Sequence, residues 1–340
     1  MSTGGGITSG SVRKATAAYI ASVGAYVPPR VMSNDELAQI VNTSDEWIYS
    51  HTGIRARHVA DDDVAASDLA VEASRRALDE AQIAPAEVDL VLLATSTPDY
   101  PGLPATASIV QDRIGAERAG AMDLVAACSG FVYALATASA FIDSGQADTV
   151  LAIGAEVYSK IINWADRNTC VLFGDGAGAA VIRRGGGSGI RDNVLHSVGS
   201  GATSLYRPAG GSREICGATT DPDRTKLHMD GRQVYGFAVQ AIIDTVEELL
   251  ARNDLSIADV DHVVAHQANV RIIDAACRRA GYPVEKFFKN IAEYANTSAA
   301  SIPIALSEMQ ALGVLEKGQL VVTVGFGSGL SFGGNLIEWT

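Results

Sequence analysis

Residues 86–94, AEVDLVLLA, return in altered form as residues 258–266, ADVDHVVAH. Each copy is an acidic turn followed by an apolar run with the length of a buried strand. An amphipathic helix is predicted before each copy, over residues 68–81 and over residues 236–251. The copies lie 172 residues apart, about half of the 340-residue chain. This spacing predicts an internal duplication of an α/β unit.

A second pair of similar segments follows in the same order. Residues 129–156 and residues 297–327 each contain a helical stretch, a Gly-Gln turn and an apolar strand with a glycine. Strands that are nearly continuous in Val, Ile and Leu are typical of sheets buried between helix layers. We therefore expect a flexible N-terminal extension and two α/β halves, over residues 1–18, 19–185 and 186–340. The Gly-, Ser- and Pro-rich stretch 186–230 is expected to form loops and short strands over the site.

Composition and charge narrow the class of protein. The chain is 47% apolar, which is enough for a sizeable core, and its apolar runs are too short to span a bilayer. Residues 1–18 lack the apolar core of a secretion signal, so we expect a cytoplasmic protein without a membrane partner. A net charge of -13 argues against nucleic acid but permits a local basic patch. No disulfide or metal site is expected from the spacing of the cysteines, Cys128, Cys170, Cys216 and Cys277.

Cys128 lies in a turn between a predicted strand and a long apolar helix, within MDLVAACSGF at residues 122–131. The unpaired N–H groups and the dipole of a helix N-terminus favour a thiolate, which is the nucleophilic form of cysteine. A buried structural cysteine is an equally good interpretation of this segment alone. The segment therefore identifies a candidate nucleophile that needs partners elsewhere in the chain.

His266 and Asn296 are the candidate partners of Cys128. His266 ends the second repeated strand, and Asn296 opens the second repeated helix. Each also has a structural interpretation, as a satisfied polar side chain or as a helix N-cap. In a duplicated fold these positions face the turn at Cys128 across the cleft between the halves. Because neither is acidic, the set suits stabilisation of an enolate oxygen by neutral hydrogen-bond donors.

Two Gly-rich segments resemble nucleotide-binding loops only superficially. Residues 174–178, GDGAG, and residues 325–329, GFGSG, lack the GxGxxG spacing at the start of a helix. Binding of a nicotinamide cofactor is therefore not expected. The second segment is better suited to close approach to a ligand, where a main-chain N–H could serve as an oxyanion donor.

The motifs around these residues resemble the β-ketoacyl-acyl carrier protein synthase III family of the thiolase superfamily. They are AACSGF at Cys128, HQANVRI at His266 and NTSAASIPIAL at Asn296, supported by DRNT at residues 166–169 and FGDGAGA at residues 173–179. The likeness extends from about residue 18 to Thr340. It implies a thiolase-like fold, a five-layered α-β-α-β-α sandwich, in a cytoplasmic homodimeric acyltransferase of fatty acid biosynthesis.

The resemblance also implies a two-step condensation. Cys128 would take the acyl group of a primer acyl-CoA while the backbone N–H groups of Cys128 and Ser328 hold the oxyanion. Malonyl-acyl carrier protein would then lose CO2. The Nε2–H of a neutral His266 and the amide of Asn296 would stabilise the resulting enolate, which attacks the acyl group. No metal or redox cofactor is implied.

Further residues acquire substrate-binding roles through the same resemblance. Trp47 and Arg167 would sandwich the adenine of CoA, and Asn269 would contact the pantetheine arm. Leu103 would cross a homodimer interface to close the partner's acyl pocket. The acidic acyl carrier protein would dock on a basic patch made of Arg271, Arg278 and Arg279.

Three positions depart from the family pattern. His51 stands where an arginine is expected beside the CoA site, and Gly236 stands where a lysine is common. Leu103 replaces a bulkier phenylalanine of the acetyl-specific type. The first two leave open whether the primer donor is CoA or a carrier protein, and the third suggests a primer pocket that is not restricted to acetyl.

Alternative members of the superfamily are less well supported. A hydroxymethylglutaryl-CoA synthase needs a glutamate in the stretch occupied here by residues 94–97, ATST, and a thiolase needs a second cysteine within residues 326–329. The main alternative is a synthase-III-like acyltransferase or starter-unit enzyme of specialised, polyketide-type metabolism. An inactive partner that only binds carrier protein is not expected to keep Cys128, His266 and Asn296.

Overall fold

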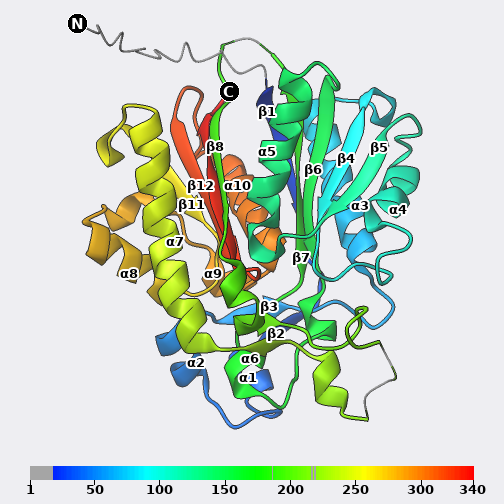
Figure 1. The fold of residues 1–340 in the computed structure, drawn as a ribbon, viewed down its shortest axis with the longest axis vertical. Coiled ribbons are helices and arrows are strands. Elements are labelled where there is room, and N and C mark those ends of the chain that lie inside the picture. The colour runs from blue at the N-terminus through cyan, green and yellow to red at the C-terminus, as the bar shows by residue number, and fades with distance from the viewer. Residues whose placement is uncertain (1–17, 186, 216, 218–219) are drawn as a thin grey trace, which may run out of the picture.

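The computed structural model describes residues 18–340 apart from residues 186, 216, 218 and 219. Two sheets stand side by side in it (Figure 1). The first has the strand order β1 (Ala18–Tyr26), β7 (Gly176–Arg184), β6 (Thr149–Glu156), β4 (Leu90–Ala94) and β5 (Gly120–Leu124). The second has the order β11 (His262–Ala265), β12 (Leu320–Gly327), β13 (Ser331–Glu338) and β8 (Ile190–Ser197). All but the last residue of the expected N-terminal extension lies outside the described residues.

Strand pairing confirms the predicted duplication. The repeated segments form β4 and β11, and each pairs in parallel with a later strand of its own half, β4 with β6 and β11 with β12. β6 and β12 then pair antiparallel with β7 and β13, which pair antiparallel with β1 and β8. The order β4-β6-β7-β1 in one sheet therefore corresponds to β11-β12-β13-β8 in the other.

The expectation for residues 186–230 is wrong for part of that stretch. β8 is an eight-residue strand that forms the edge of the second sheet, so this part does not lie over the site. Its side chains are mostly polar because it is an edge strand, and this concealed it from a search for apolar runs. The remainder contains only short elements, including β9 (Leu205–Tyr206), which pairs with β10 (His228–Met229).

Helices complete a five-layered α-β-α-β-α sandwich. α3 (Ala66–Ala81) and α4 (Thr106–Ile114) cover the outer face of the first sheet, and α7 (Gly231–Arg252) and α8 (Val270–Ala280) cover that of the second (Figure 1). α5 (Gly130–Asp143) and α10 (Ser301–Ala311) fill the central layer. Both central helices bury apolar side chains against strands of both sheets, so the turns at their N-terminal ends rest on a packed core.

Helix α7 begins five residues before its predicted start at residue 236. The carboxylate of Asp230 accepts hydrogen bonds from the backbone N–H groups of Arg232 and Gln233, which makes it the N-cap. This first turn carries little of the apolar pattern on which the prediction depended, because it lines a cavity rather than the core.

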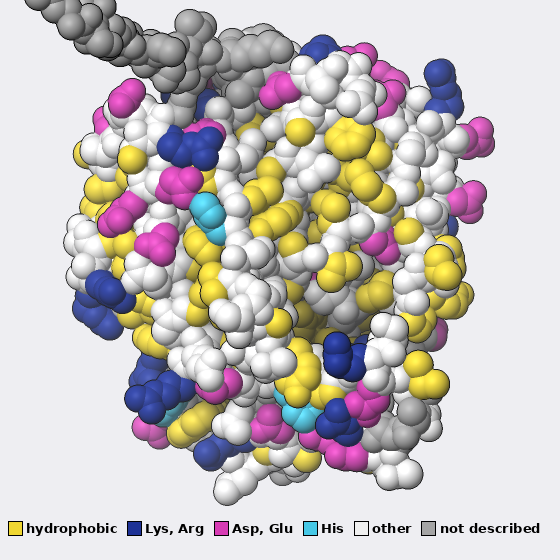
Figure 2. Space-filling model, in the orientation of Figure 1, with side chains coloured by type: hydrophobic (Ala, Val, Ile, Leu, Met, Phe, Trp, Pro, Cys, Tyr) yellow, Lys and Arg dark blue, Asp and Glu magenta, His cyan; other side chains and the backbone are white. Residues whose placement is uncertain are grey.

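The remaining elements gather at the end of the sandwich where α5 and α10 begin (Figure 1). They are β2 (Val31–Ser33), α1 (Asn34–Leu37), α2 (Asp45–Thr52), β3 (Ala56–His58), α6 (Arg167–Cys170) and α9 (Ile291–Tyr294). Figure 2 shows the hollowed face of the molecule above this end. Across the residues that the structure describes, no helix combines the length and the apolar composition needed to cross a membrane.

Candidate active site

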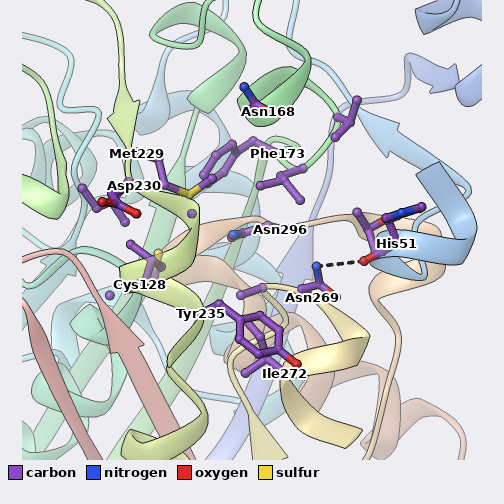
Figure 3. A pocket seen from close by; sticks show the side chains of 18 of the residues that line it. His51, Cys128, Asn168, Phe173, Met229, Asp230, Tyr235, Asn269, Ile272 and Asn296 are labelled. Atoms are coloured by element: carbon purple, nitrogen blue, oxygen red, sulfur yellow. Dashed lines mark hydrogen bonds between the residues drawn. The ribbon is translucent and has the colours of Figure 1, made fainter. Parts of the chain in front are cut away.

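A cavity of about 510 Å³ opens between the two halves of the sandwich. Its wall brings together Cys128, His266 and Asn296, which are far apart in the sequence. Figure 3 shows Cys128 and Asn296 in this wall. Nearer the surface the same wall contains four of the residues singled out above, Trp47, His51, Arg167 and Asn269. The roles of these residues remain predictions, but their common location follows from the fold.

Cys128 sits in a short 3₁₀ turn, η2 (Ala127–Ser129), between β5 and α5. The preceding Ala127 has a φ of 47°, in the left-handed region that non-glycine residues rarely adopt. Gly327 at the end of β12 lies so close that a Cβ there would be 2.8 Å from the backbone nitrogen of Cys128. A strained turn from one half is thus held against a glycine from the other.

Burial dominates the electrostatics of the Cys128 thiol. Only 3% of the residue is exposed, and desolvation raises the pKa of the thiol to about 12. Hydrogen bonding from the Ser298 side chain lowers this pKa, and the nearby Glu156 raises it further. Burial therefore opposes the thiolate that the helix N-terminus was expected to favour. The thiol must lose its proton during the reaction.

His266 follows the last residue of β11 and is 1% exposed. Its Nδ1 lies 2.6 Å from Ser301 Oγ, which also accepts a hydrogen bond from the backbone N–H of Gln267. The Ser301 hydroxyl can donate to Nδ1 while its oxygen accepts from Gln267, and this arrangement is compatible with the Nε2–H tautomer that the expected role of His266 requires. Burial lowers the pKa of His266 to about 3, so the ring is neutral. The ring packs edge-on against Phe326, with centroids 5.1 Å apart.

The amide orientation of Asn296 is also fixed by a hydrogen bond. Its Oδ1 accepts from the backbone N–H of Ser298 at 2.9 Å, which leaves the Nδ2 donors for the cavity. Figure 3 shows this nitrogen directed toward the side of the cavity that holds Cys128. Ala295 and Ser298, on either side, have φ values of 57° and 50°. As at Cys128, strained backbone positions the functional side chain.

Ser328 follows Gly327, which lines the cavity beside Cys128. Its hydroxyl donates to the carbonyl of Leu205, and its own carbonyl accepts from Ser331 Oγ at 2.8 Å. These contacts hold the Ser328 backbone next to the cysteine turn. The use of its N–H, with that of Cys128, as oxyanion donors remains a prediction.

At the mouth of the cavity, aromatic and cationic groups are stacked on one another. The Arg167 guanidinium lies 4.6 Å from the ring centroid of Trp47, and the His51 ring is stacked on Trp47 at 4.4 Å. A base inserted between Trp47 and Arg167 needs two gaps of about 3.5 Å. The predicted sandwich therefore requires Arg167 to move outward. Arg167 is exposed, and its one hydrogen bond to a carbonyl, that of Asn42, is long at 3.3 Å.

Asn269 has a structural task as well as a place in the cavity wall. Its Oδ1 accepts from the Arg271 N–H and caps α8, while its Nδ2 donates to the carbonyl of His51. One N–H of the amide remains for a ligand such as the predicted pantetheine arm.

Arg271, Arg278 and Arg279 lie outside the cavity on exposed positions of α8. Figure 2 shows basic side chains gathered on the side of the molecule where α8 lies, although the chain as a whole is acidic. Leu103 is 87% exposed, in the loop before α4, and Gly236 lies in α7 between two cavity-lining residues. The structure thus separates these sites from the reaction centre.

Three residues that sequence reasoning missed surround the centre. Ser301 and Ser298 belong to the NTSAASIPIAL motif, so their position relative to Asn296 was a usable signal. Glu156, at the end of β6, gave none, because a single acidic residue after an apolar strand is unremarkable. Within the described part of the chain, no group of three or more His, Cys, Asp and Glu side chains is arranged to hold a metal ion.

Comparison with known proteins places this site in a family. Family models described as 3-oxoacyl-[acyl-carrier-protein] synthase III and its C-terminal part match residues 122–199 and 250–339. The chain is 46% identical to the β-ketoacyl-[acyl-carrier-protein] synthase III of Caldanaerobacter subterraneus subsp. tengcongensis, over 95% of this chain and 98% of that protein.

Solved structures give the same result. The crystal structure of 3-oxoacyl-[acyl-carrier-protein] synthase III from Aquifex aeolicus matches with a TM-score of 0.88 and 40% identity, over 95% of this chain and 100% of that chain. The priming β-ketosynthase of the R1128 polyketide biosynthetic pathway matches with a TM-score of 0.89 and 35% identity, over 96% and 98%.

Proposed function

The chain belongs to the 3-oxoacyl-[acyl-carrier-protein] synthase III family of condensing acyltransferases, and we propose that it forms an acyl-Cys128 intermediate from a primer acyl-CoA. The family reaction initiates fatty acid synthesis. The observation that supports this mechanism is the convergence of Cys128, His266 and Asn296, each 5% exposed or less, on one cavity.

In the first step, the Cys128 sulfur attacks the thioester carbonyl of the primer. The backbone N–H groups of Cys128 and Ser328 hold the oxyanion, and CoA leaves as the thiol. Trp47 and Arg167 separate to admit the adenine of CoA, while Asn269 holds the pantetheine arm.

In the second step, malonyl-acyl carrier protein loses CO2. The enolate oxygen accepts hydrogen bonds from His266 Nε2–H and Asn296 Nδ2, and its carbon attacks the acyl group on Cys128. The products are 3-oxoacyl-acyl carrier protein and free enzyme. This step uses two neutral donors fixed in orientation before the substrate arrives, which is the arrangement that stabilises a developing oxyanion best. Neither step calls for a metal or redox cofactor.

The partners are an acyl carrier protein and a second copy of the chain. Arg271, Arg278 and Arg279 offer an acidic carrier protein a basic surface on α8. β5 is an edge strand with an unpaired side, and the apolar side chains of Leu103 and Val125 close to it are 87% and 84% exposed. Pairing of two β5 edges would cover both and bring Leu103 to the partner's acyl pocket.

A starter-unit role in polyketide-type metabolism is the second candidate. The observation that favours it is the similarity to the R1128 priming β-ketosynthase, whose TM-score of 0.89 slightly exceeds the 0.88 of the Aquifex aeolicus synthase III, although its sequence identity is lower. The two roles share the acyl-Cys128 step and differ in primer and acceptor.

The test is to incubate the protein with a panel of acyl-CoA esters, measure intact mass, and then add malonyl-acyl carrier protein. The expected result is an acyl adduct that Cys128→Ala abolishes and that malonyl-acyl carrier protein converts to a 3-oxoacyl product. An adduct that persists in Cys128→Ala refutes the nucleophile. Loading that malonyl-acyl carrier protein does not discharge, but a hydroxyl or amine acceptor does, selects the specialised acyltransferase.

A further inference from the structure

The proton of the Cys128 thiol has no acceptor among the residues assigned so far. In the proposed decarboxylation step the Nε2–H of His266 is a donor, so Nδ1 is the unprotonated nitrogen and accepts from the Ser301 hydroxyl 2.6 Å away. Neither ring nitrogen is then free to take the thiol proton. The cavity wall also contains Asp166 and Asp230, but their carboxylates cap the N-termini of α6 and α7.

Glu156 is a fully buried carboxyl group behind the cysteine, away from the cavity wall. Its oxygens accept hydrogen bonds from the Thr97 hydroxyl at 2.6 Å and from the backbone N–H of Ser96 at 3.1 Å. A weaker bond comes from the Thr95 hydroxyl at 3.4 Å. These contacts hold the carboxyl group in one position without pairing it with a cation.

Ser298 connects this carboxyl group to the nucleophile. Its hydroxyl donates to Glu156 Oε1 at 3.0 Å, and hydrogen bonding from the same side chain lowers the pKa of the Cys128 thiol. Ser298 is 0% exposed, has a φ of 50°, and belongs to η8 (Ser298–Ala300), which is in contact with the η2 turn that carries Cys128. Burial raises the pKa of Glu156 to about 7, which suits a group that exchanges a proton near neutral pH.

We propose that Glu156 accepts the thiol proton of Cys128 through the hydroxyl of Ser298 during acyl transfer. The S–H bond breaks as sulfur forms its bond to the acyl carbon; the thiol proton passes to Ser298 Oγ while the Ser298 proton passes to Glu156. The C–S bond to the leaving group then breaks, and the leaving sulfur takes the proton back along the same path. Ser298 and Glu156 act as positioning residues, since Cys128 alone bonds to the substrate.

Charge balance favours this path over release of the proton to solvent. The buried cluster carries one negative charge before the transfer, on Glu156, and one afterwards, on sulfur or the oxyanion. Bringing a second buried charge into the cluster would be costly. Glu156 interacts electrostatically with the titratable side chains of Cys128 in η2 and of Tyr158 in η3 (Tyr158–Lys160). The Tyr158 hydroxyl stays neutral because burial raises its pKa. Asp175 precedes Gly176, the residue of β7 that pairs with Glu156. Its carboxylate accepts hydrogen bonds from the backbone N–H groups of Ala60 and Ser159 instead.

The inference rests on the proposed acyl-Cys128 step, and single-turnover acylation by an acyl-CoA tests the two separately. If the wild type forms no adduct on Cys128, the proposed function fails. If it does, the acylation rate of the wild type is expected to rise with pH and to level off near 7, as Glu156 loses its proton. Glu156→Gln is expected to lower the plateau rate by about 100-fold or more and to remove the inflection.

Ser298→Ala provides an independent variant if Glu156→Gln does not fold. Alanine already occupies positive-φ positions at Ala127 and Ala295, so the backbone can tolerate it. The expected result is the same loss of the inflection, and the double variant should be no slower than either single one. Either variant refutes the inference if, folded by circular dichroism, it keeps the wild-type rate and inflection. Faster acylation in Glu156→Gln also refutes it, because it would mean that the charge of Glu156 only opposes the thiolate.

Thr97→Val is the matched control. It removes a hydrogen bond that lowers the pKa of Glu156 but leaves the path through Ser298 intact. The inflection should therefore persist and move to higher pH. A purely structural role for Glu156 predicts no such movement, so an unmoved inflection in folded Thr97→Val contradicts the inference.

Discussion

The floor and the mouth of the cavity are built in different ways. At the floor, Cys128, His266 and Asn296 are buried, and a directed hydrogen bond fixes the imidazole and the amide. At the mouth, Trp47, His51 and Arg167 stack on one another and are partly or fully exposed, and the side-chain hydrogen bonds of His51 and Arg167 go to nearby groups at the surface. Strained backbone lies next to the functional side chains on both sides of the cleft, at Ala127 in one half and at Ala295 and Ser298 in the other.

This difference separates the chemistry from the choice of substrate. A fixed, desolvated floor can stabilise the oxyanion of a thioester whatever acyl chain it carries, because the hydrogen-bond donors are already in place before the substrate binds. At a mouth that must open to admit a ligand, substitutions cost little in stability or activity. Two departures from the family pattern, His51 and Gly236, lie at the mouth, and the third, Leu103, is exposed elsewhere on the surface. Substitutions should therefore have large effects at the floor and small effects at the mouth.

The largest effect is expected for Asn296→Asp. The substitution keeps the oxygen that accepts from Ser298 N–H but replaces the amide donors with a carboxylate oxygen facing the enolate. The decarboxylation rate should fall by about 10²- to 10³-fold. Acylation by acyl-CoA, measured by intact mass in a single turnover, should change far less. Equal losses in both half-reactions would contradict a role confined to the enolate.

Gly327→Ala tests how tightly the two halves must meet. The added Cβ would lie 2.8 Å from the backbone nitrogen and 3.0 Å from the Cβ of Cys128, so the cysteine turn must shift. A loss of about 1–3 kcal/mol in the free energy of unfolding is expected, with slower acylation, because overpacking distorts the floor.

Gly236→Ala is the matched control for Gly327→Ala. It adds the same methyl group to a position where a Cβ meets no atom within 4 Å. This variant should acylate at the wild-type rate and should melt slightly higher. If both alanine variants behave alike in thermal denaturation and acylation, the close approach at Gly327 does not constrain the floor.

Trp47→Ala should have a moderate effect on substrate binding. The ring supplies the stacking surface for adenine, and such contacts contribute about 1–2 kcal/mol. The KM for acyl-CoA should rise by about tenfold, while the rate at saturation is retained. The control is a primer on acyl carrier protein, which lacks adenine and should be unaffected. A comparable loss with both donors would show that Trp47 supports the fold of the mouth instead.

Much of the fold followed from the sequence, because the duplicated strands carry the continuous apolar runs that strands buried on both faces require. β8 was missed because an edge strand does not need apolar residues on both faces. At the floor, strand-end and helix-start positions were enough to bring His266 and Asn296 to Cys128. The effect of burial on the pKa of Cys128 was not foreseen, since this burial depends on both halves and cannot be judged from the local turn. The link from Cys128 to Glu156 depends on one hydroxyl of the opposite half and was equally inaccessible.

Gly236→Lys is expected to have the smallest effect on stability and on KM. It tests whether a cation on this part of α7 can reach the substrate at the mouth. Gly236 is exposed in the first turns of α7, between Tyr235 and Phe237 of the cavity wall. Replacing a helical glycine with lysine should raise the free energy of unfolding by about 0.5–1 kcal/mol. The added cation should also lower the KM for phosphate-bearing substrates a few-fold at low salt, and this gain should disappear as salt screens the charge.

Gly236→Gln separates these two contributions, since glutamine has a similar helix propensity without the charge. It should melt as Gly236→Lys does but leave KM at the wild-type value at every salt concentration. If glutamine lowers KM equally, helix stability rather than charge controls the mouth. If neither variant changes KM even at low salt, the substrate phosphates pass farther from this face of α7 than the Debye length at that salt, about 30 Å at 0.01 M. In that case the absence of the family's lysine has no bearing on the choice of primer donor, and His51 is left as the departure that could affect it.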